Sequence, residues 1–126
     1  MEKQLRKVLI IEDDQAIRET LAEILNIENY EVSVAGNGQQ ALDQLGTEIL
    51  PHLILLDLMM PVMDGFTFRQ EQLKNPVWSK IPVIIMSADG HLNEKLAQIG
   101  GVAYMRKPPD LEALIDAVGK YGSLSK

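Results

Sequence analysis

Short runs of uninterrupted apolar residues constrain the fold of this chain more than any other feature. They occupy residues 8–11, 53–56 and 83–86. None of them shows the polar alternation of a strand that has one face in water. Runs of this kind are typical of strands buried on both faces, as in a parallel sheet covered by helices. Residues 30–35 and 102–105 are two weaker strand candidates.

Helical periodicity separates these candidate strands. Apolar side chains recur at helical spacing in five segments, which lie at 17–25, 41–45, 65–73, 92–99 and 111–118. Asp14 and Asp110 stand just before the first and last of these segments, where an aspartate is a favoured helix N-cap. The third segment is the least amphipathic, because Arg69 and Gln70 fall where apolar residues would help packing.

The start of the second helix has two readings. Asn37-Gly38 is a dipeptide that also occurs in β-hairpin turns. The residues that follow have apolar side chains at helical spacing, so we prefer a helix start. Strands then alternate with helices five times, which predicts an α/β fold with a parallel sheet and right-handed crossovers.

Polar side chains follow four of the five predicted strands, at the point where each of these strands ends. Glu12 and Asp13 follow the first strand, Asp57 the third and Ser87 the fourth, and Lys107 follows the fifth. In doubly wound folds the functional site lies at the carboxyl ends of the strands. Each residue alone would most often be a turn or cap residue, but their joint occurrence predicts one site.

The chemistry of that set is specific. Three carboxylates close together repel one another unless a cation lies among them. Carboxylate oxygens without Cys or His suit Mg²⁺. A carboxylate beside Mg²⁺ can act as a nucleophile toward a phosphoryl group and form an acyl phosphate. Ser87 and Lys107 supply the hydroxyl and the ammonium that a transferring phosphoryl group needs.

With these residues in place, the sequence resembles a bacterial response-regulator receiver domain of the CheY-like kind. The resemblance covers roughly residues 6–121 and rests on the segments VLIIEDDQAIR, ILLDLMMPVMDG, IPVIIMSA and AYMRKP followed by DLEALIDAV. It implies a flavodoxin-like three-layer sandwich, with five helices around a five-stranded parallel sheet of order 2-1-3-4-5. It also implies one receiver domain over residues 1–126.

The resemblance further implies a role for each acidic residue. Asp57 would be the phosphoacceptor and a ligand of Mg²⁺. Asp13 would bind the metal directly, and Glu12 would bind it through a water molecule. The backbone carbonyl of Met59 would be the third protein ligand.

The switch is implied in the same way. Ser87 would bind the phosphoryl group, Lys107 would pair with it, and Tyr104 would rotate inward into the space that Ser87 leaves. The face formed by the fourth helix, fifth strand and fifth helix would then change its affinity for a downstream protein or a second copy of the chain. The phosphoryl group would come from a sensor histidine kinase or a phosphotransfer protein.

Two positions are expected to tune the lifetime of the phosphorylated form. Met59 replaces a side chain that, in the family, overhangs the phosphoryl site. A methionine cannot orient a water molecule there, so we expect slow self-dephosphorylation. Asp89 is the second position, and its carboxylate could either orient a water molecule or remain solvated.

Composition narrows the function classes. The chain has 126 residues, no cysteine and a formal net charge of −6. This acidity disfavours direct binding to nucleic acid or to an anionic membrane. The first apolar run is too short for a signal peptide or a membrane span. We therefore expect a cytoplasmic bacterial protein of one domain.

Two other functions compete with the phosphoacceptor hypothesis. A pseudo-receiver would act by binding alone, but such domains usually lose an acidic, acceptor or lysine position that this chain keeps. Phosphatases of the haloacid-dehalogenase type also use an aspartate after a buried strand, with a second aspartate two residues later as general acid. Here that position is Met59, which has no proton to give. We therefore expect a signalling module that catalyses only its own phosphorylation and dephosphorylation.

Overall fold

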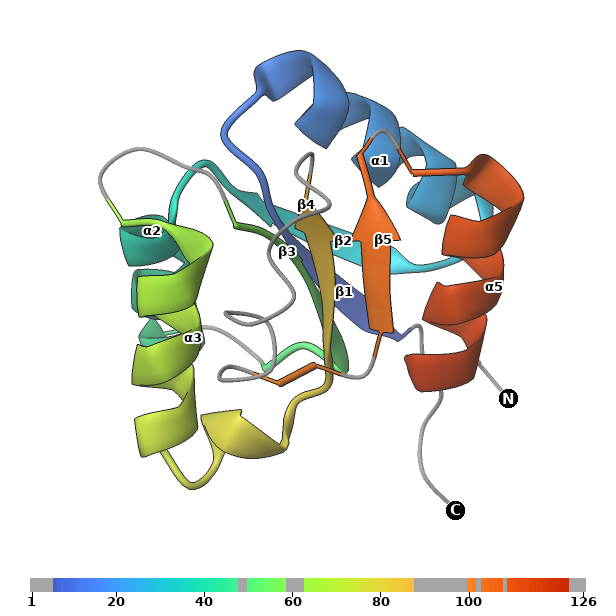
Figure 1. Cartoon of the computed structure of the whole chain (residues 1–126). Helices are drawn as coiled ribbons and strands as arrows, with labels where there is room; N and C mark the ends of the chain where they lie inside the picture. The colour runs from blue at the N-terminus through green and yellow to red at the C-terminus, as the bar shows by residue number, and fades with distance from the viewer. Residues whose placement is uncertain are drawn as a thin grey trace.

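The computed structural model describes residues 6–47, 50–58, 63–87, 100–101, 103–107 and 109–122. Strands and helices alternate along these residues (Figure 1). In chain order they are β1 (Lys7–Ile11), α1 (Gln15–Ile27), β2 (Glu31–Ala35), α2 (Gly38–Thr47), β3 (Leu53–Asp57), α3 (Gly65–Lys74), the 3-10 helix η1 (Trp78–Lys80), β4 (Val83–Ser87), β5 (Ala103–Arg106) and α5 (Leu111–Tyr121).

The strands form one sheet of order β2-β1-β3-β4-β5, and every neighbouring pair is parallel. Helices α1 and α5 cover one face, while α2 and α3 cover the other (Figure 1). This is the predicted flavodoxin-like, CheY-like architecture. The predicted helix at 92–99 lies outside the described residues.

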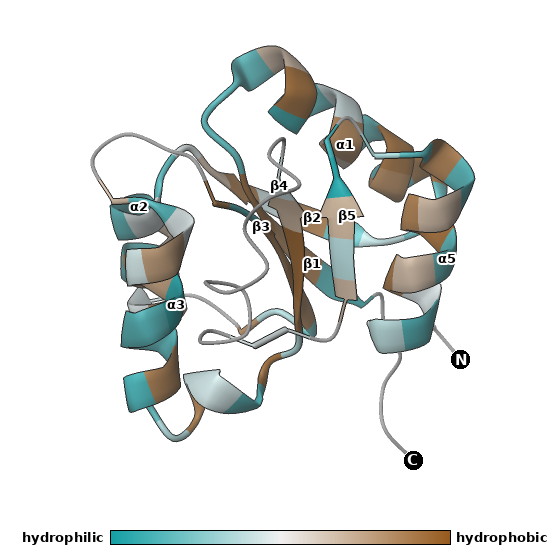
Figure 2. Ribbon diagram, in the orientation of Figure 1, coloured by the Kyte–Doolittle hydropathy of each residue, from teal (hydrophilic) through white to brown (hydrophobic). Residues whose placement is uncertain are grey.

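The core is divided by the sheet into two apolar layers. Every residue of β1, β3 and β4 is buried, and Figure 2 shows these strands as the most hydrophobic part of the molecule. Alternate side chains enter opposite layers, as the pleat requires. Leu9 and Ile11 lie on the α2/α3 side, whereas Val8 and Ile10 lie on the α1/α5 side.

Side-chain caps fix where the helices begin. Asp14 accepts a hydrogen bond from the backbone N–H of Ile17 at 3.0 Å. Asp110 caps α5 in the same way through Ala113, also at 3.0 Å. Both predicted N-caps are therefore confirmed. The oxygen of Asn37 accepts from the N–H of the residue three positions later at 2.9 Å, so Asn37-Gly38 begins a helix rather than a hairpin.

Helix α3 departs from a simple amphipathic pattern. Gln70 is exposed, but Arg69 and Gln72 are buried, and Gln72 donates hydrogen bonds to two backbone carbonyls near η1. The prediction that polar residues fall on the packing side of this helix is thus confirmed for Arg69 and wrong for Gln70. Polar hydrogen bonds replace part of the expected apolar contact.

Candidate functional site

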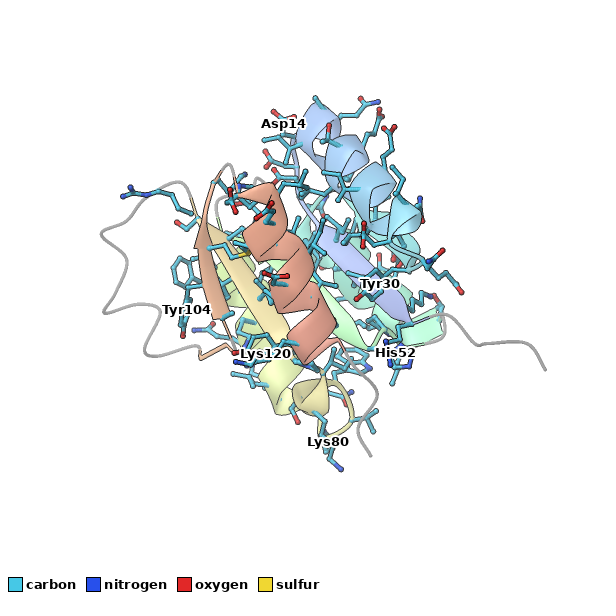
Figure 3. The ribbon with its side chains drawn as sticks, turned by 90° about the vertical axis from the view of Figure 1, so that its right-hand side faces the viewer. Asp14, Tyr30, His52, Lys80, Tyr104 and Lys120 are labelled. Carbon is cyan, nitrogen blue, oxygen red and sulfur yellow. The ribbon has the colours of Figure 1, made fainter. Side chains whose placement is uncertain are left out.

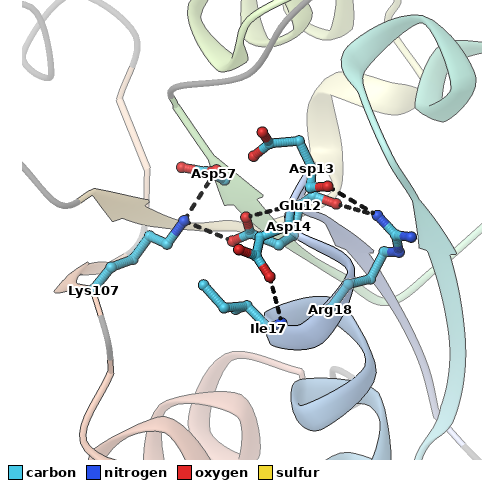
Figure 4. A network of polar contacts seen from close by, with 7 residues as sticks. All are labelled: Glu12, Asp13, Asp14, Ile17, Arg18, Asp57 and Lys107. Atoms are coloured by element: carbon cyan, nitrogen blue, oxygen red, sulfur yellow. Dashed lines mark hydrogen bonds and ion pairs between the residues drawn. The ribbon is translucent and has the colours of Figure 1, made fainter.

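Three carboxylates meet at the carboxyl ends of β1 and β3 (Figure 4). One oxygen from each of Glu12, Asp13 and Asp57 lies within 4.8 Å of the others. Glu12 is 0% exposed and Asp57 is 1% exposed, whereas Asp13 is open to solvent. Parallel pairing of β1 with β3 brings these residues together, because it aligns the ends of the two strands.

Lys107 supplies the positive charge of the cluster. Its Nζ lies 2.8 Å from Oε1 of Glu12 in an ion pair and donates a hydrogen bond to Oδ2 of Asp57 at 3.2 Å (Figure 4). The backbone N–H of Lys107 also donates to the carbonyl of Ser87 at 3.0 Å. The end of β5 is thereby fixed to the end of β4, and the lysine side chain is directed at Asp57.

Burial controls the charge of Glu12. Desolvation is the largest influence and raises its pKa from 4.5 to about 6. The contact with Lys107 and the N–H of Asp14 lower this pKa, while the charge of Asp57 raises it. Burial also opposes the charge of Lys107, but its two carboxylate partners outweigh burial and raise the Lys107 pKa.

Arg18 holds the backbone that carries the acidic pair, and the sequence reasoning missed this residue. Its Nη1 donates to the carbonyl of Glu12 at 2.8 Å and to that of Asp13 at 3.4 Å (Figure 4). Arg18 lies one helical turn after the N-cap Asp14. This spacing was the only feature of the sequence that could have pointed to its contact with the loop before α1. A positive side chain one turn into α1 can fold back over the preceding loop.

Gly65 allows α3 to begin directly against the end of β3, which carries Asp57. Its N–H donates to the carbonyl of Leu58 at 3.0 Å. A Cβ at this position would lie 2.5 Å from the carbonyl oxygen of Asp57 and 2.7 Å from the Cα of Leu58. The close approach therefore requires glycine.

Ser87 and Tyr104 lie on the same side of the sheet. Ser87 is buried at the end of β4, and its neighbour Met86 pairs with Asp57. Met86 and Met105 pack in the α1/α5 layer, so the residues next to them in sequence face the α2/α3 side. Tyr104 is 49% exposed there. Met59 and Asp89, which are predicted to tune the lifetime of the phosphorylated form, lie outside the described residues.

The donor set fits a hard divalent cation. It consists of carboxylate oxygens from Glu12, Asp13 and Asp57, which are the ligands that Mg²⁺ prefers. Lys107 compensates only part of their charge.

No helix in the described part of the chain is both long enough and apolar enough to cross a membrane.

Comparisons with known proteins agree with this geometry. The family model for the response regulator receiver domain matches residues 8–119. Sporulation initiation phosphotransferase F of Bacillus subtilis is 38% identical over 117 residues, which cover 91% of this chain and 92% of that protein. The DNA-binding dual master transcriptional regulator RpaA of Synechocystis is 34% identical over 114 residues, covering 89% of this chain but only 47% of the relative.

Solved structures give the same result for the fold. The chemotaxis protein CheY4 of Vibrio cholerae superposes with a TM-score of 0.86 at 25% identity, covering 94% of this chain and 99% of that one. The chain therefore spans nearly all of the shorter relatives and about half of the transcriptional regulator.

Proposed function

Because this chain belongs to the response regulator receiver family of two-component signalling proteins, we propose that Asp57 is its phosphoacceptor. The observation that carries the proposal is the contact of Lys107 with Asp57 at 3.2 Å, inside a cluster of three carboxylates. A buried carboxylate with an ammonium beside it and a serine on the neighbouring strand is suited to accept a phosphoryl group.

The acidic residues would hold one Mg²⁺ ion. Asp13 and Asp57 would bind it through carboxylate oxygens, Met59 through its backbone carbonyl, and Glu12 through a water molecule. When bound, such an ion would neutralise negative charge between the carboxylates and the incoming phosphoryl oxygens. The three converging carboxylates support this assignment.

In the transfer step, a carboxylate oxygen of Asp57 forms a bond to phosphorus. The bond from phosphorus to its donor breaks and its electron pair stays with the donor. In a phosphohistidine this is a P–N bond and the imidazole ring leaves, and in acetyl phosphate it is a P–O bond and acetate leaves. The product is an acyl phosphate on Asp57. Lys107 moves from the carboxylates to a phosphoryl oxygen, and the hydroxyl of Ser87 donates a hydrogen bond to another. Water later attacks phosphorus, which releases inorganic phosphate and restores the carboxylate of Asp57.

The output would follow from Ser87 and Tyr104. When the serine hydroxyl moves toward the phosphoryl group, Tyr104 turns inward and changes the face that includes β5 and α5. This is a shift between two populations, driven by the stronger binding of the phosphoryl group in one of them. The exposed position of Tyr104 is consistent with the resting population.

The partners follow from the same chemistry. A sensor histidine kinase or phosphotransfer protein donates the phosphoryl group, and a downstream protein or a second copy of the chain reads the switched face. We assign one receiver domain to residues 1–126, with its core at about 6–121, which the family match over 8–119 supports. A receiver of this kind works in the bacterial cytoplasm and catalyses only its own phosphorylation and dephosphorylation.

Intact-mass measurement tests the proposal. The protein is incubated with acetyl phosphate, with and without Mg²⁺, as wild type, Asp57→Asn and Asp43→Asn. The last variant changes an exposed aspartate of α2 and serves as a matched control. We expect one phosphoryl adduct that requires Mg²⁺, persists in the control and is lost in Asp57→Asn. An adduct that survives in Asp57→Asn would overturn the acceptor assignment, and no adduct in wild type would favour a binding-only pseudo-receiver.

A further inference from the structure

A charged side chain lies buried in α3 at a position where packing alone favours an apolar one. Arg69 is only 8% exposed, although its helix lies against the apolar α2/α3 layer. Its Nη1 donates a hydrogen bond to Oε1 of Gln72 at 2.8 Å. Gln72 is itself fully buried and donates to the carbonyls of Trp78 at 2.8 Å and Ile81 at 3.2 Å. The guanidinium is therefore held in one orientation by the helix end and η1.

That orientation brings the Arg69 guanidinium close to Gly100, three residues before β5 begins. A Cβ built on Gly100 would lie 3.9 Å from Nη2 of Arg69. The guanidinium thus spans from α3 to the segment that leads into β5. An arginine buried to this extent loses much of its hydration, and that loss must be offset by polar or aromatic partners.

Tyr104 is placed to be such a partner. It faces the α2/α3 side, because its neighbour Met105 packs in the opposite layer. It also pairs in register with Ile85 of β4, and Figure 3 shows its ring on the side of β5 away from α5. Burial lowers the pKa of the Arg69 guanidinium, while Tyr104 acts in the opposite direction and favours the charged form.

We propose that Arg69 is a positioning residue for Tyr104. Arg69 holds the ring and hydroxyl of the tyrosine toward α3 and so sets how far the tyrosine side chain turns inward. A planar guanidinium can stack on an aromatic face and donate to a phenolic oxygen. Both contacts strengthen as water is excluded, so inward rotation of Tyr104 is favoured by Arg69. The consequence for switching rests on the proposed function, but the proposed contact between Arg69 and Tyr104 does not.

A double-mutant cycle on the unphosphorylated protein tests the contact. Urea unfolding is measured for wild type, Arg69→Met, Tyr104→Leu and the double variant. Gln70→Met, an exposed neighbour on α3, is combined with Tyr104→Leu as the matched control. We expect the two changes at 69 and 104 to be coupled by at least about threefold in the unfolding equilibrium constant, with no coupling in the control.

Independent effects at 69 and 104 would overturn the proposal, because a purely structural arginine would destabilise the fold without coupling to Tyr104. If Arg69→Met does not fold, Arg69→Lys replaces it in the cycle. Lysine keeps the charge but lacks the planar fork of arginine. The cycle with Arg69→Lys therefore measures how much better arginine interacts with Tyr104 than lysine does, and we expect a difference of about threefold in the unfolding equilibrium constant. No difference between arginine and lysine would contradict the stacked geometry.

A second measurement tests the consequence for switching. Trp78 is the only tryptophan, and Gln72 connects its backbone to Arg69. We expect phosphorylation, verified by intact mass, to change Trp78 emission in wild type and to change it at least threefold less in Arg69→Met. Two results would overturn this consequence. In the first, phosphorylation changes Trp78 emission as much in Arg69→Met as in wild type; in the second, phosphorylation of wild type does not change Trp78 emission at all. If wild type forms no phosphoryl adduct, that result counts against the proposed function instead. The double-mutant cycle then still tests the proposed contact between Arg69 and Tyr104.

Discussion

The Nζ atom of Lys107 lies 3.2 Å from Oδ2 of Asp57, although 50 residues separate the two in the chain. The same nitrogen lies 2.8 Å from Oε1 of Glu12. One ammonium therefore compensates two carboxylates that are almost fully buried. The charge balance of the site depends on this lysine whenever no metal ion is bound.

Replacing Lys107 by Met should destabilise the metal-free protein. Loss of one partner leaves buried carboxylates without compensation, which we expect to cost about 3 kcal/mol of unfolding free energy. Added Mg²⁺ should stabilise this variant more than wild type, and adduct formation with acetyl phosphate should slow by at least about tenfold. Thermal unfolding with and without Mg²⁺ measures the first two effects. Lys74→Met, at an exposed site, is the control, and equal stabilisation by Mg²⁺ in both variants would contradict the prediction.

Glu12 should give the metal-free protein a distinctive pH dependence. Its pKa rises from 4.5 to about 6 on folding, so the folded state binds the proton more tightly than the unfolded state. Stability must therefore fall as pH rises through that window. Relative to Glu12→Gln, wild type should lose about 1 kcal/mol of unfolding free energy between pH 4.5 and neutrality. Urea unfolding of both proteins across this range tests the sign, and a relative gain would show that the ion pair with Lys107 outweighs burial.

Gly65→Ala should disturb the end of β3, which carries Asp57. The new methyl group would meet backbone atoms of Asp57 and Leu58 at 2.5 and 2.7 Å, so the backbone must shift. We expect a loss of about 2 kcal/mol in stability and slower phosphorylation of Asp57. Gly46→Ala is the matched control, because Gly46 lies in α2 and the added carbon would meet nothing within 4 Å beyond its own stretch of helix. That change should be neutral or stabilise by about 0.5 kcal/mol; similar losses at both glycines would show that close packing is not the cause.

Arg18→Met should weaken Mg²⁺ binding without unfolding the protein. The arginine holds the carbonyls of Glu12 and Asp13 at 2.8 and 3.4 Å and thereby orients their side chains. Loss of a group that orients metal ligands typically weakens affinity by about tenfold or more. Titration calorimetry with MgCl₂ measures this effect, with Glu19→Met on the exposed side of α1 as the control. An unchanged dissociation constant in Arg18→Met would remove its positioning role.

Met59→Asn should shorten the lifetime of the phosphorylated form. An asparagine can hydrogen-bond a water molecule near the phosphoryl group, whereas a methionine side chain cannot orient it. We expect severalfold faster loss of the adduct, followed by intact mass after removal of acetyl phosphate. Faster decay in wild type than in Met59→Asn would show that this position does not protect the acyl phosphate.

Local sequence patterns predicted the helix starts well. Asp14 and Asp110 cap α1 and α5 as expected, because an N-cap depends on a side chain and a backbone N–H only three residues apart. The buried strands were equally clear, since residues buried on both faces must be apolar. Arg69 was recognised as unusual, but its reach toward Gly100 was not predicted, because that contact joins segments far apart in the chain.

The sequence alone determined the alternation of strands and helices, the caps, and the identity of the acidic, hydroxyl and ammonium groups at the strand ends. These properties depend on residue type and on spacing over a few positions. Only the tertiary structure decided that Lys107 contacts both Glu12 and Asp57, that Arg18 holds the acidic loop, and that Arg69 is buried. Each of these depends on distances between segments brought together by the parallel sheet, and burial then sets the charge state of Glu12.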